Sequence, residues 1–388
     1  MKRTYKYRLY PTTTQRQTLE RTLNMCRLLY NNALAERKQK YEREGNSPSY
    51  YEQKRNLVNA KLCDPSLTQA HSQVLQDVIL RIDKAFKHFF RRIKKGAKAG
   101  YPRFKGRNRY DSFTYPQYGN GVSLGNGRLT LSKIGSIRIL QHREIPSNAR
   151  IKTCTVRRDV DRWYACFTIE FTHETSLKDV KNMIGVDMGL ESLITLSNGE
   201  KTAPPRYLGL SERKLRREQR RLSRREKGSA NRAKQQIRVA KIHRKIREQR
   251  RDFTHKLSRQ LVNRYDLIAF ENLNVVNMIH NRHLAKSIAD SGWNMLQTFT
   301  AYKAEEAGKL VKFVTARDTS LICSRCSFPI SKTLSTRTHR CHNCGLVLDR
   351  DWNAALNILK RVRWGTAELT PAENSQWALN ETGSPLHS

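Results

Sequence analysis

The sequence predicts a multidomain α/β protein, because three kinds of segment follow one another along its 388 residues. A first strand is followed by helical segments and then by a block of short strands. From Asn182 onward, apolar strands alternate with long helices. Two cysteine pairs in the last quarter of the chain predict a small metal-stabilised module within this second part. At about 100–200 residues per domain, the length predicts two or three domains.

The first half of the chain predicts a β-rich block with a helical insertion. Residues 2–10 alternate between apolar and basic side chains and stop at Pro11, which predicts a strand. Thr12 to Thr14 can cap a helix, and a second helical pattern covers residues 79–93. Glycines and prolines interrupt residues 96–126. Short strands are then expected at 129–131, 136–140, 151–156 and 163–171. We expect these strands to form a small barrel with the first strand.

The second half has the pattern of a mixed α/β core. Residues 183–189 read as an apolar strand that contains Asp187, and the turn at 197–200 predicts a β-hairpin. The remaining expected elements are a strand at 267–271, a helix at 293–310, a strand at 311–314 and a helix at 351–362. The polar residues that follow the last helix predict a disordered tail.

The charge balance points to a polyanionic partner. The chain has 74 Lys and Arg against 34 Asp and Glu, a net charge of +40. Such a charge repels itself unless a polyanion neutralises it, so we expect nucleic acid, with an anionic membrane surface as the weaker alternative. An ordinary metabolic enzyme with a small neutral substrate is excluded. Since no apolar run is long enough to span a membrane, and the start lacks a signal-peptide core, we expect a soluble, intracellular (cytoplasmic) protein.

Much of the positive charge lies in one helical stretch. Between Glu212 and Arg251 there are 18 Lys and Arg residues against 4 Glu, a net charge of +14. Apolar residues form only a thin stripe there, as expected for helices that dock one face. Like charges three and four residues apart destabilise a helix unless something neutralises them. We therefore predict nucleic-acid contact for this stretch rather than a merely solvated surface.

Four of the eight cysteines stand in two pairs, Cys323/Cys326 and Cys341/Cys344, with fourteen residues between the pairs. This spacing predicts a tetrahedral zinc site, with two unrelated redox pairs or an iron–sulfur site as the alternatives. Four thiolates leave no open coordination position, so the zinc is expected to be structural. Gly345 follows the second pair, as the tight turn of a zinc knuckle favours, whereas Ser327 follows the first.

Three acids stand in contexts that need an explanation: Asp187, Glu271 and Asp351. An acid inside an apolar strand is costly unless it is paired or binds a cation, so Asp187 is either a metal ligand or part of a buried salt bridge. Asp351 opens a helix, where an ordinary N-cap is the alternative. Together, three carboxylates can hold two divalent cations roughly 4 Å apart, an arrangement that hydrolyses phosphodiesters.

Several of these residues belong to longer motifs. The motifs are Tyr5–Thr12, Cys26–Asn31, Gly100–Lys105, Gly185–Gly189, Phe270–Leu273, Thr319-Ser320 with the two cysteine pairs, and Asp349–Ile358. In these motifs the sequence resembles the TnpB family, transposon-encoded nucleases of OrfB type that are similar to compact type V CRISPR effectors. The resemblance covers essentially residues 1–362, and the sequence departs from the family pattern at Ser327, where Gly is usual.

The resemblance implies an RNA-guided DNA endonuclease with an RNase H-like (RuvC) nuclease core, interrupted by a zinc ribbon. Asp187, Glu271 and Asp351 would be the catalytic triad, holding two Mg²⁺ ions, and the cysteines would hold one Zn²⁺. Asp349 is the rival to Asp351, which we choose because it stands directly before x-Asn-Ala-Ala. Asp266 is a poor rival to Glu271, since five strand residues place it roughly 17 Å away. The implied partners are a guide RNA and double-stranded target DNA with a short flanking motif, bound by a monomer rather than a dimer.

The family pattern also implies domain boundaries. They are a wedge β-barrel domain at 1–11 and 116–180, a helical recognition domain at 12–115, a RuvC-like domain at 181–316 and 350–363, a zinc-ribbon target-nucleic-acid-binding module at 317–349, and a tail at 364–388. Candidate nucleic-acid contacts are Lys6, Arg8, Tyr101, Arg103, Phe104, Lys105, Arg216, Arg220, Arg224, Arg232, Lys241, Arg244 and Arg325.

Two other functions compete with the nuclease. One is an RNA-guided DNA-binding protein that has lost cleavage, and the other is a transposition accessory protein or a transposase. The presence of all three acids favours the nuclease over the first. An acid triad alone does not exclude a strand-transfer enzyme of the RNase H class.

Overall fold

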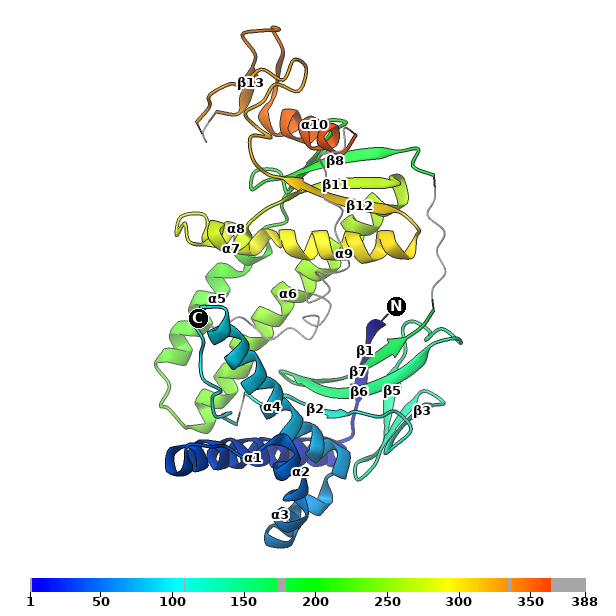
Figure 1. Cartoon of the computed structure of the whole chain (residues 1–388), viewed down its shortest axis with the longest axis vertical. Coiled ribbons are helices and arrows are strands. Elements are labelled where there is room, and N and C mark those ends of the chain that lie inside the picture. The colour runs from blue at the N-terminus through cyan, green and yellow to red at the C-terminus, as the bar shows by residue number, and fades with distance from the viewer. Residues whose placement is uncertain (1, 108, 173–178, 334–335, 364–388) are drawn as a thin grey trace. The chain divides into compact units, whose positions relative to one another are not determined.

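The computed structural model describes residues 2–107, 109–172, 179–333 and 336–363 (Figure 1). The chain divides into two compact units, Met1–Thr172 and His173–Ser388. Each unit combines a sheet with helices, so the α/β class predicted from the sequence is confirmed. The predicted tail at 364–388 lies outside the described residues. Among the helices that are described, none has the length and apolar character needed to cross a membrane.

The first unit is built on a seven-stranded sheet with the order β2-β6-β7-β1-β5-β4-β3. Its strands are β1 (Lys2–Tyr10), β2 (Ser112–Tyr115), β3 (Val122–Gly125), β4 (Arg128–Leu131), β5 (Gly135–Leu140), β6 (Arg150–Asp159) and β7 (Arg162–Glu170). Strand β1 lies in the middle because it pairs antiparallel with both β5 and β7. Closure of this sheet into a barrel stays a prediction.

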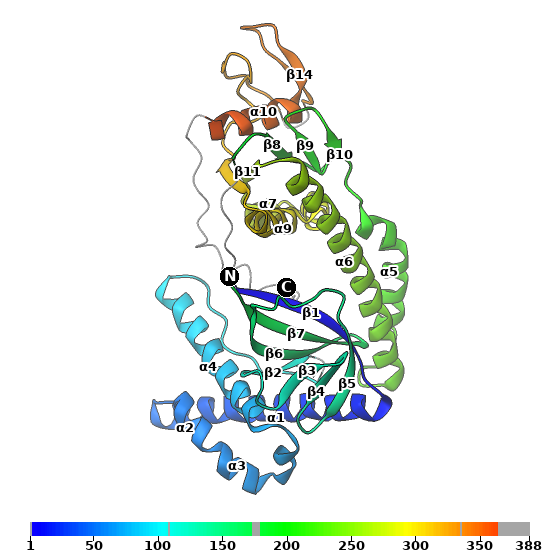
Figure 2. The same cartoon turned by 90° about the vertical axis from the view of Figure 1, so that its right-hand side faces the viewer.

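The helices of the first unit are inserted between β1 and β2, as expected (Figure 2). They are α1 (Thr13–Glu44), α2 (Tyr50–Arg55), α3 (Leu57–Cys63), the short 3-10 helix η1 (Pro65–Gln69) and α4 (Ser72–Lys94). Thr12 starts α1 with a capping box, in which its side chain accepts a hydrogen bond from the N–H of Gln15. One apolar core joins α1 and α4 to the sheet through residues such as Leu19, Leu75 and Phe113.

The second unit contains a five-stranded sheet with the order β10-β9-β8-β11-β12. Its strands are β8 (Met183–Met188), β9 (Ile194–Leu196), β10 (Lys201–Thr202), β11 (Leu267–Asn272) and β12 (Leu310–Thr315). Strand β9 pairs antiparallel with β10 across the turn at 197–200, which confirms the predicted hairpin. Strand β8 pairs antiparallel with β9 and parallel with β11. Strand β11 in turn pairs parallel with β12.

Different helices cover the two faces of this sheet (Figure 1). The helices are α5 (Tyr207–Ser223), α6 (Ala230–Arg264), α7 (Val275–Ile279), α8 (Ala285–Ser291), α9 (Trp293–Glu306) and α10 (Arg350–Arg363). Val186 and Phe270 belong to the core formed with α6 and α9, whereas Ala269 packs against Ile358 of α10. Because side chains alternate along a strand, residues 187 and 271 share the face that α10 covers.

Helix α10 touches β8 backbone to backbone at Gly185. A Cβ atom at this glycine would lie 2.1 Å from the carbonyl oxygen of Ala355 and 2.9 Å from the amide nitrogen of Leu359. Backbone atoms cannot swing aside as a flexible side chain can. Glycine is therefore required here by the closeness of the helix, and this contact sets the height of α10 above the sheet.

We expect Gly185→Ala to lower the free energy of unfolding by about 1–3 kcal/mol, because the new methyl group forces α10 away from β8. Denaturant unfolding of the full chain measures this. Gly209→Ala is the matched control, since nothing lies within 4 Å of a Cβ at Gly209, a position inside α5. There, alanine is expected to be neutral or stabilising. Equal stability of Gly185→Ala and the wild type would contradict the close contact.

Between β12 and α10 lies a small module with the two-stranded sheet β13 (Thr338–Arg340) and β14 (Val347–Asp349). Few of its described residues are buried, among them Cys323, His339 and Cys341. The chain leaves the five-stranded sheet after β12, builds this module and returns with α10 to the same sheet. The module is therefore attached to the sheet at both of its ends.

Candidate active site and metal centre

The structure brings the three predicted acids together at one end of the five-stranded sheet. Val186 of β8 is the register partner of Phe270 of β11, so Asp187 and Glu271 follow as neighbours on the α10 face. Asp351 lies in the first turn of α10. Its Oδ2 atom is 3.9 Å from where a Cβ would stand at Gly189, directly after β8. Two parallel strands and one helix thus each present one acid.

The charges of these acids affect one another. Burial raises the pKa of Asp187 well above its usual range, and the negative charges of Glu271 and Asp351 raise it further. Burial also raises the pKa of Glu271, a residue only 6 % exposed. Carboxylate oxygens are the ligands that Mg²⁺ prefers, and a cation would relieve this repulsion. The donor set therefore fits a hard divalent cation.

Asp349, the rival to Asp351, has a structural role. Its Oδ1 accepts hydrogen bonds from the backbone N–H groups of Asp351 (3.0 Å) and Trp352 (3.1 Å), so it caps α10. Its other oxygen pairs with Lys201 at 2.8 Å. Partial burial acts to raise the pKa of Asp349, but the bonds from Lys201 and the backbone outweigh it and lower that pKa. The N-cap role considered for Asp351 belongs to Asp349.

Asp266, the rival to Glu271, lies at the opposite end of β11. Its Oδ2 accepts a hydrogen bond from the backbone N–H of Asn182 at 3.0 Å. Its Oδ1 pairs with Lys309 at 3.3 Å. The carboxylate therefore ties the starts of neighbouring strands together, and its side chain is directed away from the acid cluster.

Two guanidinium groups face Asp351. The Nε atom of Arg350 lies 3.1 Å from Oδ1, and Nη1 of Arg337 lies 3.8 Å from Oδ2. Arg337 belongs to the cysteine-containing module and also pairs with Glu191 at 3.0 Å. These cations offset part of the charge of Asp351, the acid that α10 contributes.

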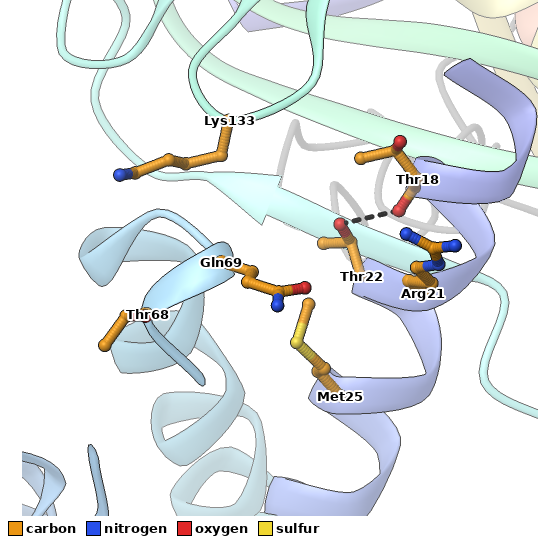
Figure 3. A pocket seen from close by; sticks show the side chains of 7 residues that line it. All are labelled: Thr18, Arg21, Thr22, Met25, Thr68, Gln69 and Lys133. Atoms are coloured by element: carbon orange, nitrogen blue, oxygen red, sulfur yellow. Dashed lines mark hydrogen bonds between the residues drawn. The ribbon is translucent and has the colours of Figure 1, made fainter. Parts of the chain in front are cut away.

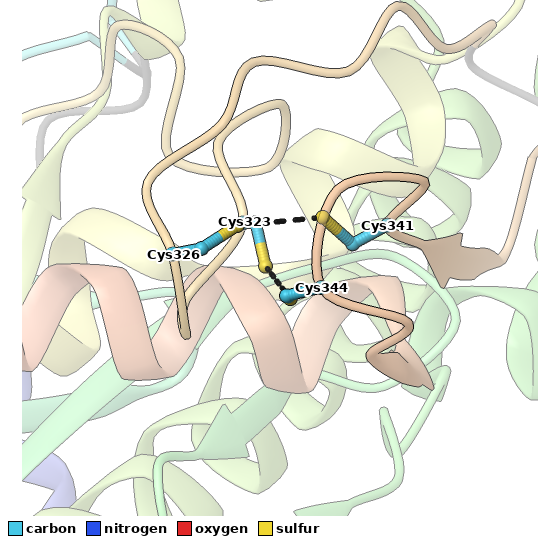
Figure 4. Close-up of side chains that lie close together, drawn as sticks. All are labelled: Cys323, Cys326, Cys341 and Cys344. Carbon is cyan, nitrogen blue, oxygen red and sulfur yellow. Dashed lines mark hydrogen bonds between the residues drawn. The ribbon is translucent and has the colours of Figure 1, made fainter.

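The four paired cysteines converge on one point (Figure 4). Their Sγ atoms all lie within 4.8 Å of one another. Cys323 and Cys344 are 3.6 Å apart and Cys326 and Cys341 are 3.5 Å apart, measured between Sγ atoms. A tetrahedral zinc with Zn–S bonds of 2.3 Å requires sulfurs about 3.8 Å apart. The geometry fits one structural Zn²⁺ bound by both pairs.

The two knuckles have the same backbone path. Ser327 has φ 61° and Gly345 has φ 69°, both in the left-handed region. The N–H of Ser327 donates to the carbonyl of Cys323, and that of Gly345 donates to the carbonyl of Cys341, each at 3.0 Å. Ser327 therefore adopts the same left-handed conformation as Gly345. The departure from the family pattern at Ser327 leaves the geometry of the knuckle unchanged.

We expect Ser327→Gly to stabilise the protein by about 0.5–1 kcal/mol. The left-handed conformation costs a non-glycine residue about 1–2 kcal/mol, and the greater freedom of glycine in the unfolded chain offsets part of this gain. Thermal unfolding of the zinc-loaded chain measures the shift. Gly345→Ser, at the matching position, is expected to lower the stability by a similar amount, and a destabilising Ser327→Gly contradicts the strain.

Two asparagines hold the first knuckle to α10, and the sequence alone indicated no role for them. Asn353, fully buried, accepts a hydrogen bond from the N–H of Ser324 (2.9 Å) and donates to the carbonyl of Ile322 (2.8 Å). Asn357 donates to the carbonyls of Ile322 (2.7 Å) and Thr319 (2.8 Å). Two amides four residues apart on a buried helix face are a signal for such bonds, since unpaired polar groups there are costly.

Three family models match successive parts of the chain. The Helix-turn-helix domain of OrfB_IS605 matches residues 1–46, which hold β1 and α1 here, and OrfB_IS605, described as "Probable transposase", matches 166–282. The "Cas12f1-like, TNB domain" matches 293–358. A "Putative RNA-guided DNA endonuclease" of Streptomyces pristinaespiralis is 36% identical over 366 residues, covering 92% of this chain and 89% of the relative. The chain belongs to the OrfB/TnpB family of IS605 type.

A second TnpB-family relative covers nearly the whole chain. The "Putative RNA-guided DNA endonuclease InsQ" of Escherichia coli K12 is 32% identical over 402 residues, covering 98% of this chain and 96% of the relative. The fold is similar to a Cas12f1 chain solved in an sgRNA–target DNA complex, with a TM-score of 0.54 and 14% identity. That likeness covers 90% of this chain and 83% of the other.

The basic stretch of this TnpB-family chain forms the helical hairpin of α5 and α6. The side chain of Gln235 donates to Glu218 across the hairpin at 2.8 Å. Arg232 donates to the carbonyls of Leu222 (2.9 Å) and Arg225 (2.6 Å), at the end of α5 and in the turn after it. Arg244 is only 6 % exposed. The other candidates in this stretch are Arg216, Arg220, Arg224 and Lys241, and they are exposed. Arg232 and Arg244 have positions suited to holding the hairpin together.

Lys6 and Arg8 lie on the same face of β1. The centroid of the Tyr164 ring on β7 lies 4.1 Å from Nζ of Lys6 and 5.3 Å from the guanidinium carbon of Arg8. Both cations are partly exposed, so this side of the sheet carries positive charge over an aromatic ring.

The Gly100–Lys105 motif docks on α1. The side-chain oxygen of Asn31 accepts from the N–H of Lys105 at 2.8 Å, and its amide donates back to the carbonyl at 3.0 Å. Tyr101 and Phe104 remain 44% and 53% exposed. Arg103 is exposed in this motif, and so is Arg325 in the first zinc knuckle. The Cys26–Asn31 and Gly100–Lys105 motifs therefore hold each other in place.

A cavity of about 340 Å³ lies in the first unit (Figure 3). It is lined by Thr18, Arg21, Thr22, Met25, Thr68, Gln69 and Lys133. The hydroxyl of Thr22 donates to the carbonyl of Thr18 at 3.0 Å. The amine of Lys133 points away from the other labelled side chains. The predicted site residues are absent from its lining.

Proposed function

We propose that this chain is an RNA-guided DNA endonuclease of a transposable element, in which Asp187, Glu271 and Asp351 form the catalytic triad. The convergence of these acids at one end of the sheet carries the proposal. Membership of the OrfB/TnpB family supports it, as do the names of the relatives. The net charge of +40 favours binding of a phosphodiester backbone, and the acids of the cluster need a cation. Both properties fit a metal-dependent site that acts on nucleic acid.

Mg²⁺ ions bound by the triad would activate a water molecule and stabilise the leaving oxygen of the phosphodiester. The chain's own task is to present three carboxylates from rigid elements. Strands β8 and β11 place two of them side by side on one face of the sheet, and α10 brings the third at a height set by Gly185. Asp349 fixes the first turn of α10, and Arg337 and Arg350 orient the carboxylate of Asp351.

We further propose the domain layout of the family. Residues 181–316 and 350–363 form an RNase H-like (RuvC) nuclease domain, supported by the antiparallel hairpin beside parallel strands. Residues 317–349 form a zinc-ribbon target-nucleic-acid-binding module, supported by the match to a TNB domain. Residues 1–11 and 116–180 form the wedge domain, and 12–115 form the recognition domain, although its last strand, β2 at 112–115, pairs with β6 in the sheet of the wedge domain.

The partners we propose are a guide RNA, which selects the target by base pairing, and double-stranded DNA with a short flanking motif. The protein acts as a monomer. The exposed cations of the α5–α6 hairpin, Arg216, Arg220, Arg224 and Lys241, contact nucleic-acid phosphates. Lys6, Arg8, Tyr101, Arg103, Phe104, Lys105 and Arg325 are further proposed contacts, to backbone or bases.

One experiment tests this function. The full chain is purified from cells, the RNA bound to it is sequenced, and the complex is incubated with Mg²⁺ and a plasmid library that carries the matching target beside random flanks. We expect cleavage of plasmids with one short flanking motif. Absence of bound RNA together with absence of cleavage overturns the proposal, and guided binding without cleavage favours the cleavage-deficient alternative.

A further inference from the structure

The loop that leads into the zinc module touches one of the three acids. The hydroxyl of Thr319 donates a hydrogen bond to Oε1 of Glu271. Both residues are buried, with exposures of 4% and 6%. The last torsion of a glutamate side chain is broad and roughly two-fold, so a carboxylate without a partner samples many orientations. A bond to Oε1 restricts this rotation and fixes the direction of Oε2.

The backbone of Thr319 is itself held. Its carbonyl accepts a hydrogen bond from the side chain of Asn357 at 2.8 Å, and the same side chain donates to Ile322 at 2.7 Å. Asn353, one helical turn earlier, bonds Ile322 and Ser324 on either side of Cys323. A continuous set of hydrogen bonds therefore runs from the first zinc knuckle through α10 to the carboxylate of Glu271.

The same helix carries Asp351 and rests on Gly185, two residues before Asp187. The backbone carbonyl of Glu271 also accepts a hydrogen bond from the side chain of Gln297 on α9, at 2.9 Å. Glu271 is thus held at its backbone by one helix and at its carboxylate by the loop that another helix anchors. This is the arrangement by which outer partners orient metal ligands.

We propose that Thr319 is a positioning residue, which orients the carboxylate of Glu271 for a divalent cation and is itself locked by Asn357. The proposal rests on the proposed function, because it assigns Glu271 to the metal site. It gives the loop before the zinc knuckle a role in the nuclease centre, separate from contact with nucleic acid.

Thr319→Val removes the hydroxyl at nearly constant volume, and Thr319→Ser keeps it. Two quantities are measured on the full chain: Mn²⁺ affinity without RNA, by calorimetric titration, and the Mg²⁺ concentration for half-maximal programmed cleavage. Loss of an outer partner typically weakens metal affinity or activity 10–100-fold. We expect this loss in both measurements for Thr319→Val, and values within about 3-fold of the wild type for Thr319→Ser. Thr338→Val, at an exposed site on β13, is the matched control and should change neither.

The outcomes separate positioning from packing. If Thr319→Val lowers the melting temperature but leaves both metal measurements unchanged, the threonine only packs and the proposal is overturned. Equal losses in Thr319→Val and Thr319→Ser overturn it as well. If Thr319→Val does not fold, Thr319→Ala replaces it in the same comparison.

The metal titration also separates this proposal from the proposed function. If the wild type cleaves no programmed DNA but binds Mn²⁺, and Glu271→Gln loses that binding, the nuclease proposal fails while Thr319 remains testable. If Glu271→Gln binds Mn²⁺ as the wild type does, Glu271 is not a ligand and the positioning role is overturned.

Discussion

Asp187→Ala, Glu271→Ala and Asp351→Ala are each expected to slow programmed DNA cleavage at least about 1,000-fold, while binding of guide RNA and target stays within a few-fold. Each change removes one of the three carboxylates proposed to hold the cations, a loss of several kcal/mol of transition-state stabilisation. Binding persists because the acids contribute negative charge, which does not attract phosphates. Cleavage rates and filter binding on the same complexes measure both effects.

The melting temperature distinguishes loss of a catalytic carboxylate from misfolding of the variant. The raised pKa of Asp187 means that ionising this carboxyl group costs more free energy in the folded state than in the unfolded chain. At neutral pH the charged group therefore destabilises the folded state. In the absence of divalent cations, Asp187→Ala should therefore melt at the same temperature as the wild type or higher. If Asp187 instead stabilised the fold through an ion pair or hydrogen bonds, Asp187→Ala would lower the melting temperature.

Two control acids sharpen the assignment. Asp252→Ala removes an exposed acid of α6, whose side chain is 65% accessible, and should leave the cleavage rate unchanged. Asp349→Asn weakens the cap and the Lys201 ion pair, so it should lower stability more than cleavage. Cleavage at the full rate by any of the three triad variants would falsify the triad, and loss of cleavage in Asp349→Asn alone would transfer the role to Asp349.

Cys341→Ser is expected to release the zinc, unfold the module between β12 and α10 and abolish cleavage. Structural zinc contributes an apparent binding free energy of about 10–16 kcal/mol, and this module has few buried residues to replace it. Unfolding the first knuckle also removes the backbone partners of Asn353 and Asn357, so α10 and Asp351 lose their anchor. Elemental analysis should find one zinc per wild-type chain and much less in the variant.

Cys63→Ser is the matched control, since Cys63 is a single exposed cysteine of the first unit. It should keep one zinc per chain and full cleavage. A Cys341→Ser chain that still carries one zinc and cleaves normally would rule out the four-cysteine site.

The sequence allowed accurate prediction wherever the signal was local. Alternation over residues 2–10 identified β1, and the two-residue spacing within each cysteine pair identified the cluster. Asp187 stood out because an acid interrupts the apolar run of β8. Such patterns follow from the geometry of one strand or one turn, so no knowledge of distant contacts is needed.

Features that depend on distant contacts were missed. Strands β2 and β3 lie within or beside the stretch of residues 96–126, where glycines and prolines interrupt the pattern, so neither was expected from the sequence. The role of Thr319 depends on a strand 48 residues earlier, and those of Asn353 and Asn357 depend on a loop 29 to 38 residues earlier. Arg232 looked like its basic neighbours, but the turn after α5 gave it carbonyl partners.

The placement of Asp351 on α10 has a consequence for protein synthesis. Asp187 and Glu271 leave the ribosome well before α10, and the zinc module is made in between. At about 5–20 residues per second, the 164 residues from Asp187 to Asp351 take roughly 8–33 s to add. Until α10 is made, the acids of β8 and β11 lack their third member, and their face of the sheet lacks its cover. With the proposed triad, a nascent chain cannot cut DNA until α10 has formed, by which time the basic helices α5 and α6 are already made.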